Sequence, residues 1–137
     1  MSRRIVMLMG VAVLLAAPMI FAQLNPALEA EIPFTFEAGK SVLPAGQYRV
    51  TAGPSQGVIE LACPDSKVRM FVSTNAVRSL ETVREGKLVF HRYGNRYFLW
   101  QIWNVGTDTG RELMASKAEK ELARSAGAGQ TVVVSVR

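Results

Sequence analysis

The chain has 137 residues, which is enough for one domain and too few for two of ordinary size. Its 16 Lys and Arg against 11 Asp and Glu are interspersed along the chain, and so weak a basic excess argues against nucleic-acid binding. The single cysteine, Cys63, excludes an intramolecular disulfide scaffold. One cysteine and one histidine, His91, are too few ligands for a zinc site. No metal and no cofactor is therefore expected.

Residues 1–22 have the layout of a secretory signal peptide. Two arginines give a positive start, residues 5–17 are an unbroken apolar run, and the segment ends in the small residue Ala22. We expect cleavage before Gln23, so that the mature protein is exported to the periplasm, the cell envelope or the medium and has no membrane span. The alternative is an uncleaved anchor, because residues 5–22 approach the ~20 apolar residues that cross a bilayer.

The mature chain, residues 23–137, is predicted to form a single β-rich domain. Short segments of alternating apolar and polar residues, separated by Pro- and Gly-containing turns, are typical of half-buried antiparallel strands. The strands expected first cover 32–37, 47–50, 57–63 and 67–72. Their inward side chains are Ile32, Phe34, Phe36, Tyr48, Val50, Ile59, Leu61, Cys63, Val68, Met70 and Val72.

The second half of the chain contains the only predicted helix. Residues 74–86 would fit one face of a short helix or an irregular strand, and they are interpreted as a loop with a possible strand. The segment after the hairpin described below is interpreted as a polar connection. Ser116 and Glu119 form a capping box, in which each side chain satisfies a backbone donor at the start of a short, mostly charged helix. A last strand follows, whose inward residues are Val132, Val134 and Val136.

The stretch KLVFHRYGNRYFLWQIW, residues 87–103, predicts a β-hairpin with apolar side chains on both faces. Gly94-Asn95 is a two-residue loop with Gly first, the preference of a type II′ turn. The turn sets the pairs Tyr93–Arg96, Arg92–Tyr97, His91–Phe98, Phe90–Leu99 and Val89–Trp100. One face then carries Val89, His91, Tyr93, Arg96, Phe98, Trp100 and Ile102, and the other carries Leu88, Phe90, Arg92, Tyr97, Leu99, Gln101 and Trp103.

One of these faces must belong to the core, and the other needs a cover. The predicted helix at 117–124, with Leu113 and Met114 before it, is one candidate, since a helix on a sheet is a common layered arrangement. The others are a ligand cavity inside a barrel and a contact surface for another subunit. The candidate binding residues are His91, Tyr93, Arg96, Tyr97, Trp100 and Trp103.

Few residues could carry catalysis. Asp108-Thr-Gly matches the catalytic tripeptide of aspartic proteases, but Thr107 precedes it and Arg111 follows it, where those enzymes usually have apolar and small residues. A polar turn is the simpler interpretation. His91 on a strand is more often structural than a base or ligand, and Cys63 shares the inward parity of Leu61, which indicates a buried, inert thiol.

Three stretches together, IPFTFEAGKSVLPAGQYRV, KLVFHRYGNRYFLWQIW and GRELMASKAEKEL, resemble an uncharacterised family of small bacterial proteins that carry a signal peptide. The specific pieces are Leu43-Pro-Ala-Gly-x-Tyr48, the hairpin from Phe90 to Leu99, and Gly110-Arg-Glu-Leu113. The family has no assigned activity, substrate or cofactor. The resemblance therefore implies an exported single β domain and carries over no functional residue.

The sequence thus predicts a small antiparallel β-barrel or β-sandwich of about seven or eight strands, with one short helix before the last strand. The main functional hypothesis is an exported, non-catalytic protein that binds a protein partner or a small apolar ligand through the hairpin 87–103. A homodimer would be one such partnership. The alternatives are a hydrolase that uses Asp108 and a purely structural envelope protein.

Overall fold

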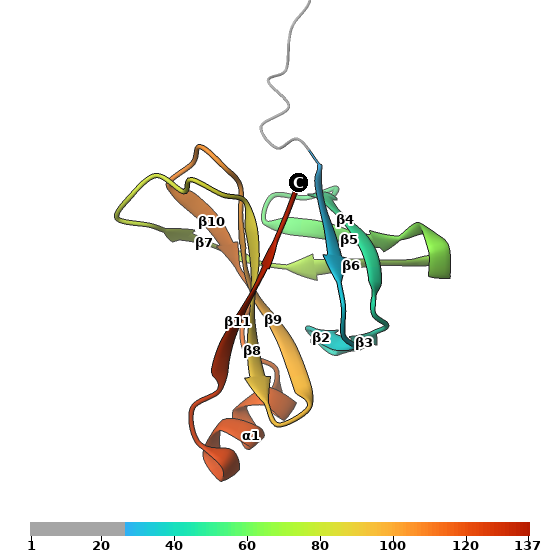
Figure 1. Ribbon diagram of the computed structural model, residues 1–137, viewed down its shortest axis with the longest axis vertical. Helices are drawn as coiled ribbons and strands as arrows, with labels where there is room; N and C mark the ends of the chain where they lie inside the picture. The colour runs from blue at the N-terminus through green and yellow to red at the C-terminus, as the bar shows by residue number, and fades with distance from the viewer. Residues whose placement is uncertain (1–26) are drawn as a thin grey trace, which may run out of the picture.

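Strands account for most of the residues that the computed structural model describes, 27–137, and they form two sheets around one apolar core (Figure 1). The predicted signal peptide lies outside the described residues. In chain order the elements are β1 (Leu28–Ile32), β2 (Phe36–Ala38), β3 (Ser41–Leu43), β4 (Gly46–Ala52), β5 (Val58–Cys63), the short 3-10 helix η1 (Pro64–Ser66), β6 (Val68–Ser73), β7 (Asn75–Arg78), β8 (Lys87–Tyr93), β9 (Arg96–Trp103), β10 (Thr109–Glu112), α1 (Lys117–Ala126) and β11 (Gln130–Ser135).

The two sheets form a sandwich with an open seam. Sheet A has the order β1-β4-β5-β6, and sheet B has the order β11-β8-β9-β10-β7, with β2 paired in parallel to β9 and β3 beside β2. Figure 1 shows β1 and β11 meeting where the chain ends, and there the Arg137 N–H donates to the Glu29 carbonyl at 2.9 Å. The two strands diverge from that bond, so the described strands do not close into a barrel.

The predicted fold class is confirmed, since the described residues are mainly strand and α1 directly precedes the last strand. They form eleven strands, more than the seven or eight expected. One reason is Pro33, which has no N–H for a sheet ladder and divides the predicted strand at 32–37. The chain leaves sheet A after Ile32 and enters sheet B at Phe36. Another reason is that β7 and β10 are short strands that pair with each other across a long separation in sequence.

Tyr48 is central to the core between the sheets. Its ring is fully buried and meets the Phe36 ring edge-on, with 5.1 Å between the ring centroids. Its hydroxyl donates to the Pro44 carbonyl at 2.5 Å, which ties the start of β4 to the turn before it, as tyrosine corners do in other sandwiches. Of the side chains predicted to face inward, all are buried or pack half-buried against this core.

Arg111 links the connections between the two sheets. Its Nε donates to the Thr74 hydroxyl at 2.8 Å and its Nη2 donates to the Thr74 carbonyl at 2.9 Å. Thr74 lies where the chain passes from β6 in sheet A to β7 in sheet B, and its own hydroxyl donates to the Gly57 carbonyl at 2.6 Å. The Arg111 in the predicted Gly-Arg-Glu-Leu motif therefore has a structural role.

Replacing Tyr48 with Phe should lower the free energy of unfolding by about 1–2 kcal/mol, because the Pro44 carbonyl loses its donor.

Burial, and secondly the adjacent Cys63, raise the pKa of Tyr48 to about 12. A phenol whose pKa is higher in the folded state stabilises the fold fully below its unfolded pKa of about 10 and loses that contribution as pH rises toward 12. Urea unfolding between pH 9 and pH 12 should therefore show a decline in the free energy of unfolding that is smaller in Tyr48→Phe, in which the raised pKa of Tyr93 still contributes. An equal alkaline decline in both proteins would contradict this assignment.

Candidate functional site

The hairpin of β8 and β9 has the predicted turn and most of the predicted register. Gly94 has a φ of +61° whereas Asn95 keeps a negative φ, as a type II′ turn requires. The four pairs nearest the turn are those predicted. The fifth, Val89–Trp100, is wrong, because a β-bulge leaves Trp100 as the extra residue of β9 and pairs Val89 with Gln101.

This bulge exchanges the faces of the residues that follow it. Ile102, expected beside Val89, faces the core with Leu88, Phe90 and Leu99. Trp103, expected on that core side, is buried on the opposite side instead. We call the side away from the core the outer face of the hairpin; it carries Val89, His91, Tyr93, Arg96, Phe98, Trp100, Gln101 and Trp103.

Five of the six candidate binding residues lie on the outer face, and Tyr97 does not. Tyr97 packs on the core side, where its ring stacks on Phe34 with 3.8 Å between ring centroids and an interplanar angle of 13°. The guanidinium of Arg92 lies 5.5 Å from the centroid of the same ring. Tyr97 is therefore a packing residue at the end of the core.

Helix α1 covers the half of the outer face that is nearest the turn. Ser116 caps the helix by accepting from the Glu119 N–H at 3.2 Å, as predicted. The Glu119 side chain does not complete the capping box. It is buried against β8, with its Oε1 3.6 Å from Nδ1 of His91, and His91 stacks on Trp100 at 4.2 Å between ring centroids.

The Glu119–His91 contact is electrostatic and longer than a hydrogen bond. Nδ1 of His91 is buried and has no hydrogen-bond partner in the structure. Burial raises the pKa of Glu119, the nearby imidazole partly offsets this, and Glu37 adds a smaller upward effect. The pKa of Tyr93 is also raised, by burial first and then by the charge of Glu119. Sequence reasoning missed this cluster because Glu119 had a simpler role as a capping residue.

At the turn, Arg96 is held by its own pairings. Its Nε and Nη2 donate to the two carboxylate oxygens of Glu37 on β2, at 3.0 and 2.7 Å. Its guanidinium also lies 5.3 Å from the Phe98 ring centroid, and Tyr93 meets that ring edge-on at 5.8 Å. Arg96 therefore fastens β2 to the hairpin, and Phe98 is sealed beneath it.

At the other end of the outer face, Trp103 lies against Gly110 of β10. Its Nε1 donates to Oε1 of Gln101 at 3.1 Å, and Nε2 of Gln101 donates to Oε1 of Glu112 at 3.0 Å. The indole is 6% exposed, so neither its ring nor its N–H is open to a ligand. Gly110 and Glu112, two residues of the Gly-Arg-Glu-Leu motif, thus hold Trp103 in place.

Between these two covered ends Val89 is buried, but some apolar side chains around it stay accessible. A row of paired residues, Val133, Val89, Gln101 and Glu112, runs across four strands of sheet B. Trp100 bulges out beside this row and is half-buried, Val133 is 54% exposed, and Met114 just after β10 is 72% exposed. We call Trp100, Met114 and Val133 the open strip. Val133 could have been found from the sequence, since a run of three valines in a strand makes both of its faces apolar.

The remaining sequence candidates lie away from this face. Asp108 is exposed on a turn, where its Oδ1 accepts from the Thr109 hydroxyl at 3.1 Å. Cys63 is buried in the core beside Tyr48. Among residues 27–137 there is no group of three or more His, Cys, Asp and Glu side chains placed to hold a metal ion.

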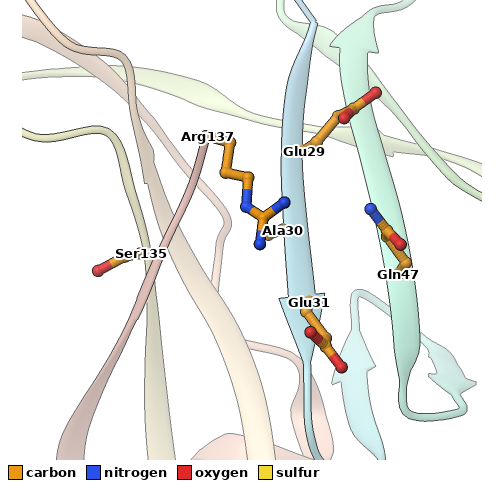
Figure 2. A pocket seen from close by; sticks show the side chains of 6 residues that line it. All are labelled: Glu29, Ala30, Glu31, Gln47, Ser135 and Arg137. Atoms are coloured by element: carbon orange, nitrogen blue, oxygen red, sulfur yellow. The ribbon is translucent and has the colours of Figure 1, made fainter.

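The seam between β1 and β11 contains two shallow cavities. Figure 2 shows the first, of about 190 Å³, with Arg137 reaching from the chain end toward β1; it is lined by Glu29, Ala30, Glu31, Gln47, Ser135 and Arg137. The second, of about 450 Å³, lies beside it and is lined by Leu28, Glu85, Gly86, Val105, Ser135, Val136 and Arg137. Most residues that line the first cavity are charged or polar, which does not suit an apolar molecule.

Comparison with known proteins adds no relative: no protein-family model, curated protein or solved structure matches the chain. In the part of the chain that the structure describes, no helix has the length and apolarity to cross a membrane.

Replacing Glu119 with Gln should stabilise the protein near pH 8, by about 1 kcal/mol. A carboxyl whose pKa is raised on folding stabilises the fold below its unfolded pKa of about 4.3 and loses that contribution as pH rises through the folded value. The advantage of Gln should therefore vanish near pH 4. Urea unfolding at both pH values checks this, with Glu121→Gln, exposed on the same helix, as the control. A variant less stable than wild type at pH 8 would contradict it.

Replacing Gly110 with Ala should destabilise the protein by about 1–3 kcal/mol. An added Cβ would lie 2.7 Å from the Cδ2 and Cε3 atoms of Trp103 and 2.9 Å from the Ile102 carbonyl oxygen, and neither the ring centre nor the backbone can move freely. Unfolding followed by tryptophan fluorescence measures the effect. The exposed neighbour Thr109→Ala should stay within about 0.5 kcal/mol of wild type, and an unchanged Gly110→Ala protein would show that Trp103 is loosely held.

Proposed function

We propose that this protein is an exported, non-catalytic β domain that binds a protein partner through the open strip on the outer face of sheet B. One observation carries the proposal. Helix α1 covers the turn half of the outer face and the Trp103 contacts cover the opposite end, but Trp100, Met114 and Val133 remain accessible between them. Large apolar side chains left accessible on one face of a sheet are candidates for an interaction site.

A protein partner fits this arrangement better than a small apolar ligand. The space between the sheets is filled by large side chains that are fully buried, Tyr48, Phe36 and Phe90 among them. The open strip consists of exposed and half-buried side chains, whereas small-molecule sites are concave and enclose most of the ligand. Trp and Met are also favoured at protein interfaces because one ring or one flexible thioether covers a large area.

The proposed export depends on residues 1–22. The proposed lack of a catalytic role agrees with the structural contacts that the titratable side chains make. Glu119 and His91 hold the helix to the sheet, and Arg96 is paired with Glu37. Asp108 stands on an exposed turn. A purely structural envelope protein remains the alternative, and it differs in needing no specific contact at the open strip.

Photo-crosslinking in the producing cell tests the proposal. A photoreactive residue at Met114 should give a discrete covalent adduct, whereas one at Phe71, 49% exposed on sheet A, should give none. Adding Trp100→Ala should reduce the Met114 adduct about tenfold or more, the scale for losing an interface Trp. Equal adducts from both positions, or none from either, would favour the structural alternative.

Native mass spectrometry of the protein recovered from its own cell envelope tests two further parts of the proposal, the export and the absence of a bound small molecule. We expect a mass that begins at Gln23 and no bound small molecule. A mass that includes residues 1–22 would show a retained anchor. A bound apolar molecule that survives purification would replace the protein partner by a ligand.

A further inference from the structure

Strand β11 presents an unpaired backbone edge. In an antiparallel ladder, alternate residues direct both backbone groups toward the same neighbour. The Val136 N–H donates to the Gly86 carbonyl at 3.1 Å. The backbone N–H and C=O groups of Val132 and Val134 therefore also point toward β8. The residues between them face the other way, as the bond from the Arg137 N–H to Glu29 confirms. The N–H and C=O groups of Thr131, Val133 and Ser135 therefore line the open edge, and no strand within 27–137 pairs with them.

This edge lacks the usual protection against pairing. Natural edge strands carry charged residues, Pro or bulges, or are very short. The other sheet edges follow that rule: β1 contains Glu29 and Glu31, β6 contains Arg69, β7 contains Arg78, and β3 has only three residues. Strand β11, QTVVVS, contains none of these features over six residues, and Val133 is 54% exposed.

The sequence of this edge is also complementary to itself. The segment Thr131-Val-Val-Val-Ser135 has the same chemistry when read in either direction. If two copies pair antiparallel about Val133, then Val133 meets Val133, and Thr131 meets Ser135 of the second copy. These are the residues whose backbone groups point outward, so each pair forms two ladder hydrogen bonds. Cross-strand pairs of β-branched residues and of hydroxyl residues both stabilise a sheet.

We propose that two copies of this protein associate through β11, paired antiparallel on a two-fold axis at Val133, so that the two B sheets become one continuous sheet. A two-fold axis of this kind is perpendicular to the sheet, and the contact is therefore isologous. Both outer faces then lie on the same side. The dimer goes beyond the function proposed above, because it joins two open strips into one surface and allows bivalent binding of a repeated or dimeric partner.

The contact ends before Arg137, whose N–H is already bonded to Glu29 of the same chain. Pairing over Thr131 to Ser135 alone is a small interface, and small interfaces are weak and reversible. We expect a dimer that forms at concentrations on the order of 100 μM and dissociates on dilution.

A charge-pair experiment on the purified full protein tests the proposal. Sedimentation velocity should show the wild-type dimer, and Val133→Lys and Val133→Glu should each be monomeric, at least about tenfold weaker in association, because two like charges face each other on the axis. An equimolar mixture of the two variants should dimerise again. Phe71→Lys, which places the same charge on a comparably exposed residue of sheet A, should dimerise like wild type.

Folding is checked separately, since Val133 is exposed and each variant should unfold within about 0.5 kcal/mol of wild type. Three results would overturn the proposal. They are a monomeric wild type at the highest concentration, single variants that dimerise as well as wild type, and a mixture that stays monomeric. None of them affects the Met114 crosslink, so the dimer and the partner-binding strip can fail independently.

Discussion

The single extra residue in β9 is the feature on which the rest of sheet B depends. Because Trp100 occupies the bulge, Ile102 reaches the core and Trp103 is directed to the outer face. Trp103 then needs a residue without a side chain beneath it, which Gly110 provides, and a polar partner, which Gln101 and Glu112 provide. The same bulge brings Trp100 out of the ladder and onto His91. β-Bulges often re-aim side chains next to functional sites, and this one places the half-buried Trp100 on the hairpin's outer face.

Both polar and aromatic contacts hold the outer face together. Helix α1 buries a carboxylate, Glu119, against His91 rather than an aliphatic side chain, and a buried charge with incomplete pairing adds little net stability. Arg96 fastens β2 at the turn through Glu37. Val89, Phe98 and Trp103 are buried on this face, whereas Val133 stays 54% exposed. The side chains that stay exposed are the ones on which the proposed partner binding depends.

The open seam has a similar origin. The sandwich leaves two edge strands facing each other, and a single bond from Arg137 to Glu29 joins them. The β1 edge carries two glutamates that discourage a further strand, while β11 carries no charge at all. An asymmetry of this kind favours pairing between two copies of β11 over pairing with β1. Partner binding at the open strip and self-association at β11 would then operate on adjacent parts of one sheet.

The sequence alone determines those features of the protein that depend on local interactions. Alternation and turn chemistry are properties of neighbouring residues, so most of the strands, the inward side chains, the type II′ turn and the position of the helix could be predicted, but not β1, β3 or β10. The bulge at Trp100, the β7–β10 pairing and the burial of Glu119 could not, because each depends on groups distant in sequence competing for one backbone or side chain. Three consecutive valines already made both faces of the last strand apolar. Only the tertiary structure decided that this strand is an edge, because strand order is set by packing between the sheets.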